Sequence, residues 1–323
     1  MRRFLRVVAV GGAGLLLLGT GFYTWASATS SRSLARSIDS HAWEVPVPHP
    51  LKAGEVEARG LTSGEAEAEA LARALDRGRH LVEARYACGE CHGSDFGGGV
   101  MVDAFPIGRL LGPNLTSGRG GVTASYSTAD WDRIVRHGIL PGGRPAVMPS
   151  EDFLLMSDQE LSDIIAYIRS LPPVDHEVPP IRLGPLGKFL VARGEIVFSA
   201  DLIHAHDAPH AELPPPAEVS VAFGRHLSGV CTGCHAMDLA GGKISGGDPG
   251  WVAAANLTPH AEGLRDWSYE DFLRAMLESR RPDGSEIREP MSFVAPFAQN
   301  MTEVEMEAIW TYLRSIEARP TGR

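Results

Sequence analysis

The residues best suited to carry chemistry in this chain are four cysteines and two histidines. They form the same pattern, C-x-x-C-H, at two places: Cys88, Cys91 and His92, and again Cys231, Cys234 and His235. This pattern is the attachment signature of c-type haem. Two thiols one helical turn apart can each add to a haem vinyl group, and the following histidine then lies under the iron as its proximal ligand. The sequence therefore predicts two covalently bound haem c groups.

Paired cysteines also occur in thioredoxin-like redox sites and in zinc half-sites. The two motifs lie 143 residues apart, whereas a zinc knuckle needs its four ligands close together. The chain has four cysteines in 323 residues, and all four lie in the motifs. This leaves no cysteine for a disulfide scaffold or for a further iron ligand. The haem interpretation is therefore favoured over these alternatives.

A haem iron held by His92 or His235 has either a second axial ligand or an open face, and this choice separates electron carriers from enzymes. Methionine suits electron transfer because it raises the reduction potential. Met148 and Met291 each lie 60 residues after the first cysteine of their motif. Both follow or precede proline in a loop before the closing helix of their region. We therefore predict His92 and Met148 as ligands of the first iron, and His235 and Met291 as ligands of the second.

The proximal histidine is usually oriented by a carbonyl that accepts its second ring N–H. The candidates are the carbonyls of Pro113 and Ala255, each of which precedes an Asn-Leu-Thr triplet. These triplets, at 114–116 and 256–258, are also part of a wider internal repeat. The chain repeats Gly-Arg-His-Leu at 78–81 and 224–227, before each motif. The pattern is typical of a duplicated domain of about 95 residues.

Each copy of the repeat ends in a predicted helix with a capping box. Ser157 with Glu160, and Thr302 with Glu305, have the spacing at which the two side chains satisfy each other's free backbone N–H groups. Met156 and Met301 precede these caps and are expected to form hydrophobic staples, so they are weaker ligand candidates than Met148 and Met291. Apolar residues continue at helical spacing, and no alternating strand pattern persists. The predicted fold class is all-α.

The first 30 residues combine arginines with an uncharged apolar stretch. Arg2, Arg3 and Arg6 precede residues 7–25, which as a helix would cover about 28 Å, close to the thickness of a hydrocarbon core. We predict a retained transmembrane helix that leaves the rest of the chain outside the cytoplasm. A cleaved signal peptide is the alternative, because Ala26-Ser27-Ala28 fits an A-x-A cleavage site.

The chain outside the repeats is rich in proline, alanine and histidine. Prolines at 46, 48 and 50 indicate a tether, although a docking element is possible. Between the repeats we expect a solvated linker; the alternative is a metal site, since His206 and His210 could share a helix face. The predicted organisation is an anchor at 1–30, a tether and helical lead-in at 31–77, a first domain at 78–173, a Pro-rich linker at 174–220 and a second domain at 221–318.

The net charge of −10 argues against nucleic acid, whose phosphates need clustered Lys and Arg. Both domains are acidic, and haem propionates would add negative charge, so a partner with a basic face is expected.

The motifs, the Gly-Pro-Asn-Leu-Thr run at 112–116 and the two methionines resemble the class I cytochrome c family over residues 78–318. They look most like membrane-anchored multihaem cytochrome c subunits of periplasmic alcohol, aldehyde or gluconate dehydrogenases, which usually carry three haems where this chain has two motifs. The resemblance implies two tandem all-α domains in which the first and last helices cross, Gly78 or Gly224 meeting the region of Tyr167 or Tyr312.

On this basis we expect a dihaem electron-transfer protein and not an enzyme. It would lie at the bacterial inner membrane with its haem domains in the periplasm, as part of a respiratory chain. Its redox partners would be a dehydrogenase subunit or quinol-oxidising complex, and another cytochrome or terminal oxidase. The alternative is a dihaem peroxidase, which needs one iron with an open or displaceable face.

Overall fold

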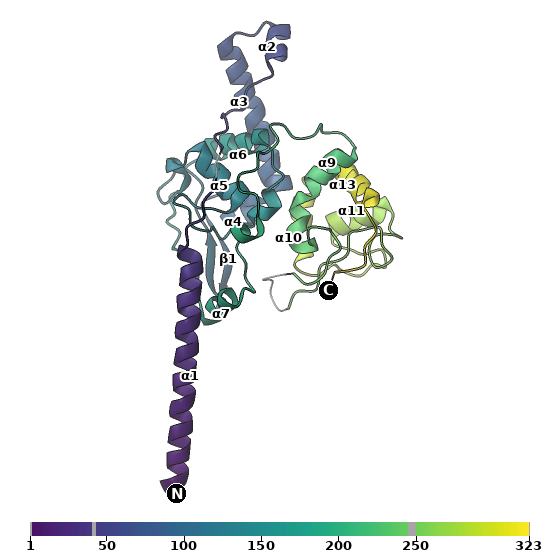
Figure 1. Ribbon diagram of the computed structural model, residues 1–323. Coiled ribbons are helices and arrows are strands. Elements are labelled where there is room, and N and C mark those ends of the chain that lie inside the picture. Colours follow the sequence, from purple (N-terminus) through teal and green to yellow (C-terminus); the bar gives the residue numbers. More distant parts are fainter. Residues whose placement is uncertain (1, 41–42, 245–249, 323) are drawn as a thin grey trace.

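The computed structural model describes residues 2–40, 43–244 and 250–322 (Figure 1). A long N-terminal helix, α1 (Arg2–Ala35), extends from two mainly helical units that lie side by side. Unit 1 is built around the first cysteine motif and unit 2 around the second. We use these two names for residues 63–173 and 221–322.

Unit 1 begins with α3 (Ser63–His80), earlier than the residue 78 expected from the repeat. A short helix, α2 (Ala53–Arg59), precedes it. The other elements of unit 1 are the π-helical turn η1 (Leu81–Arg85), α4 (Cys88–His92), β1 (Gly99–Ala104), β2 (Gly108–Gly112), η2 (Thr123–Ser125), α5 (Thr128–His137), η3 (Ser150–Phe153) and α6 (Asp158–Ser170). Its core consists of apolar side chains from α6, α5 and the residues around η1.

Unit 2 repeats the helical order of unit 1, and no strand pair is present in its described residues. Its elements are α9 (Val221–Leu227), η4 (Ser228–Cys231), α10 (Thr232–His235), α11 (Tyr269–Glu278), η5 (Met291–Phe293), α12 (Ala295–Ala298) and α13 (Glu303–Ser315). Phe223 and Leu313 are 1% exposed and lie in a second hydrophobic core separate from that of unit 1. Each repeat therefore has its own hydrophobic interior.

The first and last helices of each unit cross at a glycine. A Cβ added to Gly78 on α3 would lie 2.2 Å from the carbonyl oxygen of Asp163 on α6. A Cβ added to Gly224 on α9 would lie 1.9 Å from the carbonyl oxygen of Ala308 on α13. The predicted crossings are confirmed: only glycine lets the two helix backbones approach this closely.

The closing helices begin as predicted. The side chain of Ser157 accepts from the backbone N–H of Glu160 at the start of α6, and the Glu160 carboxylate accepts from the backbone N–H of Ser157. Thr302 and Glu305 make the same two bonds at the start of α13. Both predicted capping boxes are confirmed.

The expectation of a purely helical fold is wrong in one region. β1 and β2 pair antiparallel, from Gly99 opposite Gly112 to Ala104 opposite Gly108, and β3 (Arg182–Leu183) pairs with β2. The strands are short, β1 has no fully buried residue, and a β-bulge interrupts its pairing. No hydrophobic alternation therefore marks them in the sequence.

The linker between the units packs against unit 1 instead of running through solvent. It contains β3, α7 (Pro185–Arg193) and α8 (Ser199–Leu202). The backbone N–H of His176 donates to the carbonyl of Arg119, and the backbone N–H of Asp158 donates to the carbonyl of Ala211. Residues 174–212 are thus held along unit 1 by backbone hydrogen bonds that composition does not reveal.

The proline-spaced residues before α2 also pack against unit 1. Val45 is 4% exposed and belongs to the hydrophobic core of this unit. The carbonyl of Pro46 accepts a hydrogen bond of 2.6 Å from the hydroxyl of Ser162 on α6. This segment is therefore an outer layer of unit 1 and not a free tether.

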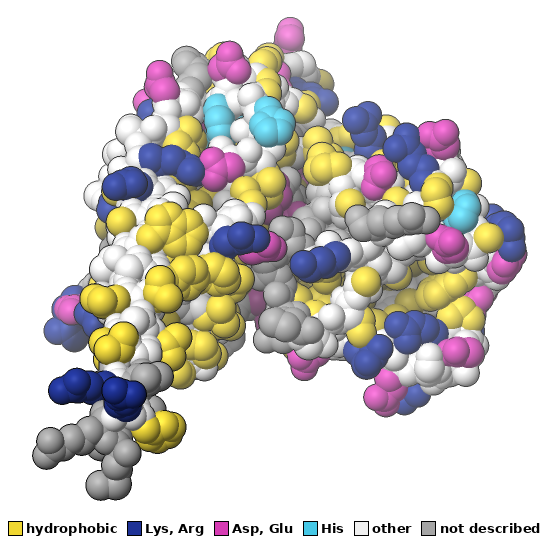
Figure 2. Space-filling model, turned by 60° about the horizontal axis from the view of Figure 1, so that its bottom comes forward, with side chains coloured by type: hydrophobic (Ala, Val, Ile, Leu, Met, Phe, Trp, Pro, Cys, Tyr) yellow, Lys and Arg dark blue, Asp and Glu magenta, His cyan; other side chains and the backbone are white. Residues whose placement is uncertain are grey.

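Helix α1 packs against α7 at its C-terminal half, where the rings of Phe22 and Phe189 lie 5.1 Å apart. Figure 2 shows hydrophobic side chains gathered along α1, and residues 15–18 are 73–74% exposed. Within the described ranges, no helix combines the length and hydropathy needed to cross a membrane, so the predicted transmembrane helix at 1–30 is not supported.

The two units contact each other through a histidine and a glutamate from each, paired in the same way in both directions. His80 of unit 1 contacts the carboxylate of Glu305 at 2.9 Å, and His226 of unit 2 contacts the carboxylate of Glu160 at 2.9 Å. These are corresponding positions of the repeat, so the interface has the reciprocal pattern of a two-fold dimer contact. Arg85 lies between the halves and donates to both carboxylates.

Candidate haem sites

The first cysteine motif forms the short helix α4, which follows a residue in the left-handed region, Ala87, with φ of 48°. Burial raises the pKa of Cys88 to about 12 and also raises that of Cys91. In unit 2, burial raises the pKa of Cys231 to about 12. A dithiol redox site instead lowers the pKa of its nucleophilic cysteine toward 7, so the environment favours neutral thiols.

One pocket in unit 1 collects the residues predicted to bind the first haem. Its walls are apolar, and Cys88, Cys91, His92 and Met148 all contribute to them. The remaining lining residues include Leu115, Trp131, Val135, Phe153, Ile164 and Ile168. An aromatic and aliphatic cavity with two thiols, an imidazole and a thioether fits a c-type haem, because the macrocycle is apolar and groups of these four kinds can bind its vinyls and iron.

The histidine of each motif is oriented by the carbonyl that the sequence predicted. His92 Nδ1 lies 3.0 Å from the carbonyl oxygen of Pro113, and His235 Nδ1 lies 2.7 Å from that of Ala255. A carbonyl can only accept, so Nδ1 carries the proton and Nε2 keeps its lone pair. Burial lowers the pKa of both imidazoles, which keeps them neutral. Both histidines are therefore prepared to bind a metal through Nε2.

The Asn-Leu-Thr triplets hold these carbonyls in place. In unit 1 the Asn114 side chain donates to the carbonyl of Val174 at 2.7 Å and accepts from the Thr116 hydroxyl at 2.8 Å. In unit 2 Asn256 donates to the carbonyl of Arg319 at 2.7 Å and accepts from Thr258. Each triplet thus ties the loop beside the histidine to the segment that follows the closing helix.

The Met148 loop is held by a residue that sequence reasoning missed. Ser199 on α8 donates from its hydroxyl to the carbonyl of Met148, and accepts from the backbone N–H of Ser150 at 3.0 Å. Met148 itself packs against the core of unit 1. No sequence signal marks Ser199, because its role depends on the linker lying against unit 1.

Met291 has different surroundings. It begins the single turn η5 after Pro290, is partly exposed, and is not among the residues packed against the core of unit 2. Of the unit 2 methionines, Met276, Met301 and Met306 do reach that core. The structure brings Met148 and His92 to one apolar pocket, and Met291 lies outside the hydrophobic core of unit 2.

A contact between the units lies beside both sites. Asp152, on η3 just after Met148, accepts a hydrogen bond of 2.8 Å from the backbone N–H of Gly233, inside the second cysteine motif. Burial raises the pKa of Asp152 to about 7. The loop of the first predicted methionine ligand therefore touches the helix that carries the second histidine.

The metal-site alternative supposed that the two linker histidines share a helix face, and they do not. His206 and His210 lie on an irregular segment after α8 and both contact His137, the last residue of α5. Burial lowers the pKa of His137 to about 4 and also lowers that of His210. The part of His137 in this cluster could not be predicted from the sequence, because a histidine in the last turn of an amphipathic helix is ordinary.

Comparison with known proteins agrees with this geometry. The family model described as cytochrome c oxidase, cbb3-type, subunit III matches residues 73–168, which are nearly the whole of unit 1. The alcohol dehydrogenase (quinone) cytochrome c subunit of Gluconacetobacter polyoxogenes is 30% identical over 262 residues, covering 72% of this chain and 53% of the relative.

Two further relatives have related descriptions. The gluconate 2-dehydrogenase cytochrome c subunit of Pantoea cypripedii is 30% identical, covering 77% of this chain and 61% of its own length. A diheme cytochrome c-type protein of Cereibacter sphaeroides is 24% identical, covering 66% of this chain and 73% of its own length. The chain spans little more than half the length of the dehydrogenase subunits. These similarities, with the haem-type pocket of unit 1, place that unit in the cytochrome c family, and the chain resembles the cytochrome c subunits of dehydrogenases.

Proposed function

We propose that this chain is a dihaem cytochrome c that relays single electrons, with one haem in each unit and His/Met ligation at both irons. The observation that carries the proposal is the apolar pocket of unit 1, whose walls hold Cys88, Cys91, His92 and Met148. Haem iron supplies the one-electron chemistry when it is bound there. The polypeptide supplies attachment, ligands and shielding from water.

The surroundings of the ligands suit a carrier. Trp131, Phe153 and Ile164 line the pocket and exclude water from the ring. With haem bound, the thioether of Met148 would take the coordination position that a peroxidase needs open, and it would favour the reduced iron. The bond between His92 Nδ1 and the Pro113 carbonyl fixes the ring, so little rearrangement accompanies a change of charge at the iron.

The contact between the units supports transfer from one haem to the other. Asp152 lies four residues after Met148 and binds the backbone of Gly233, so the ligand loop of one site adjoins the attachment helix of the next. The exchange of His80 with Glu305 and of His226 with Glu160 fixes this arrangement. A fixed short separation is what electron transfer between two centres requires.

The relatives suggest the kind of partner. Those described above are cytochrome subunits of alcohol and gluconate dehydrogenases, so the proposed donor is a dehydrogenase subunit or a quinol-oxidising complex, and the acceptor another cytochrome or terminal oxidase. The proposed location is the periplasmic side of the bacterial inner membrane, in keeping with the arginines and apolar run of the first 30 residues.

Substitution of the two methionines tests the proposal. In Met148→Ala and in Met291→Ala, one haem should lose the Met-to-iron absorption band and its potential should fall by on the order of 0.1 V, within the roughly 0.8 V over which axial ligands act. Met237→Ala is the matched control, because this methionine is 77% exposed and follows its motif directly. A high-spin haem in the unaltered protein, with peroxide turnover, would favour the peroxidase alternative and reject the carrier.

A further inference from the structure

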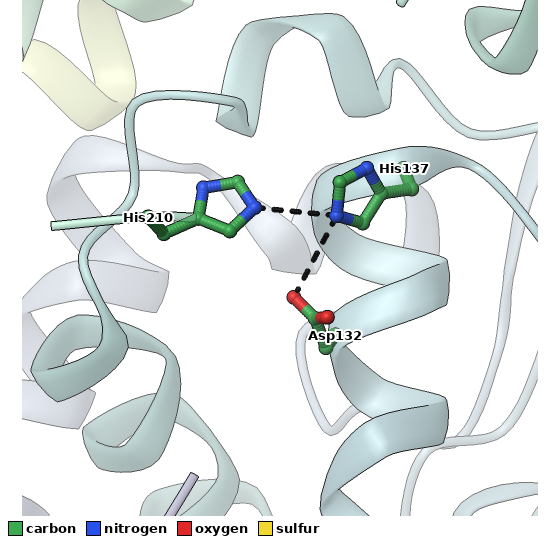
Figure 3. A group of neighbouring side chains, drawn as sticks. All are labelled: Asp132, His137 and His210. Atoms are coloured by element: carbon green, nitrogen blue, oxygen red, sulfur yellow. Dashed lines mark hydrogen bonds and ion pairs between the residues drawn. The ribbon is translucent and has the colours of Figure 1, made fainter. Parts of the chain in front are cut away.

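A cluster of side chains, Asp132, His137 and His210, lies between α5 and the linker, outside both haem sites (Figure 3). His206 lies beside it and contacts His137. His137 Nε2 lies 3.2 Å from His210 Nε2 and 3.9 Å from Asp132 Oδ1. The three atoms all lie within 4.8 Å of one another. His137 and Asp132 are 0% exposed, while His210 is partly exposed, so the cluster opens to solvent at one side only.

The hydrogen bonds fix which nitrogens carry protons. His206 Nε2 lies 3.1 Å from the carbonyl oxygen of Ala200, which can only accept, so Nε2 is the donor. The Nδ1 of a neutral His206 is then an acceptor, and it lies 3.3 Å from His137 Nδ1. His137 therefore carries its proton on Nδ1, and the lone pair of its Nε2 faces His210 and Asp132.

The ring of His210 also makes a hydrogen bond to the backbone of Leu154, which favours a proton on this ring. When that proton lies on Nδ1, Nε2 of His210 has none and faces the bare Nε2 of His137. The nearby oxygen, Asp132 Oδ1, already accepts from Arg136 Nε at 2.7 Å. The repulsion is therefore between the two nitrogen lone pairs, and a cation between the rings would relieve it.

The distance between the two histidine nitrogens suits a divalent transition metal, while the carboxylate oxygen lies farther away, 3.9 Å from His137 Nε2. A tetrahedral ion bound at about 2.0–2.1 Å from each nitrogen places its ligand atoms about 3.3 Å apart, close to the 3.2 Å between the two Nε2 atoms. The neighbouring charges also allow it. Arg136 pairs with Asp132 and Asp158, so the two carboxylates leave one net negative charge beside the site.

We propose that His137, His210 and Asp132 form a binding site for a divalent transition-metal ion of the Zn²⁺ class, with His206 orienting His137 from behind. The site is open at a fourth position, toward solvent. It joins α5 to the linker, and the linker in turn holds the Met148 loop through Ser199. An ion bound there fastens residues 199–212 to unit 1.

The test is a titration of the tag-free full chain, with both haems attached and after treatment with a chelator, with Zn²⁺ by calorimetry. The unaltered protein should bind one ion per chain, and His210→Ala should weaken that binding by at least about 100-fold. His206→Ala, which leaves all three ligands in place, should weaken it about 10- to 100-fold, the usual effect of removing a residue that orients a ligand.

His204→Ala is the matched control, since this histidine lies on the same segment but is exposed and makes no contact with the cluster. It should bind as the unaltered protein does. Unchanged haem spectra and helical content show that each variant is folded. Failure of the unaltered chain to bind one ion, or equal binding by His210→Ala and His204→Ala, would overturn the proposal.

Discussion

Units 1 and 2 share the interactions that lie nearest the motif histidines and differ in the layer outside them. Both have the histidine-to-carbonyl bond, the Asn-Leu-Thr tie and the crossing of helices at a glycine. Residues 43–50 and 174–212 pack around unit 1, where the predicted methionine lines a pocket with the histidine, whereas the predicted methionine of unit 2 lies outside its core. The repeat therefore specifies the histidine side of a haem site, while the methionine side depends on what packs around the loop.

The interface between the units also differs between its two halves, at one residue. His80 and His226 occupy equivalent positions, as do Glu305 and Glu160. Arg85, which contacts both glutamates, lies in η1, and the corresponding turn of unit 2, η4, contains no arginine. The guanidinium of Arg85 also lies over the ring of Phe223, 5.3 Å from the centroid. A nearly symmetric contact is thus completed by one asymmetric cation.

Substitution of Arg85 should have the largest effect on stability. In Arg85→Met, two buried carboxylates lose their shared cation, and breaking a buried ion pair in this way costs about 3–5 kcal/mol. Urea unfolding followed by haem absorbance measures this. Arg79→Met is the control, because Arg79 is exposed and pairs only with Asp76 at 3.7 Å. Equal midpoints for the two variants would show that the central cation is not needed.

Acid should weaken the same interface. Burial raises the pKa of Glu305, but the hydrogen bond to His80 and the charge of Arg85 outweigh it and lower the pKa from 4.5 to about 2. The stabilisation is therefore present above pH 4.5 and is lost as the pH falls toward 2; it amounts to up to about 3 kcal/mol. Unfolding free energies across this range should fall more steeply in the unaltered protein than in Glu305→Gln.

Glu160 sharpens the comparison, because hydrogen bonds with His226 and Ser157 also lower its pKa in spite of burial. Glu160→Gln should flatten the acid limb in the same direction as Glu305→Gln. If only one of the two variants changes the acid limb, the interface is not reciprocal in energy.

The glycine crossings should be equally sensitive in the two units. Gly78→Ala and Gly224→Ala place a methyl group within 2.2 and 1.9 Å of a carbonyl oxygen, and overpacking of this kind costs about 1–3 kcal/mol. Chemical denaturation measures both. Gly64→Ala, in open space on α3, should be neutral or stabilising. A tolerated alanine at either crossing would contradict the close approach described for that unit.

The capping boxes should give the smallest change. Ser157→Ala and Thr302→Ala each remove a hydroxyl that accepts from a first-turn backbone N–H and donates to the glutamate of the capping box, at a cost of about 1 kcal/mol. Ser157 is fully buried and Thr302 is exposed, so the serine variant should lose more. Thermal unfolding measures the loss of stability in both variants. A larger loss for Thr302→Ala than for Ser157→Ala would contradict the prediction that burial of the cap decides the cost.

Local patterns predicted much of each unit. The capping boxes and the partners of His92 and His235 agree with the structure, because each depends on residues with a fixed spacing or on one repeated triplet. The glycine crossings, which the family resemblance implied, agree as well. The ligation by Met148 and Met291 and the two haem groups stay predictions, which the substitutions above address. The short strands β1 and β2 could not be predicted, because neither has a buried face long enough to leave a period in the sequence.

The sequence by itself determined the duplicated motif, its helices and the carbonyl that faces each histidine, since these depend on neighbours along the chain. Only the tertiary structure decided which segments cover unit 1, how Glu160 and Glu305 are exchanged between the units, and that His137 meets His206 and His210. The cited contacts join residues 66, 69 and 73 positions apart. They form only when apolar surfaces from distant parts of the chain pack together, so the spacing of residues along the chain does not predict them.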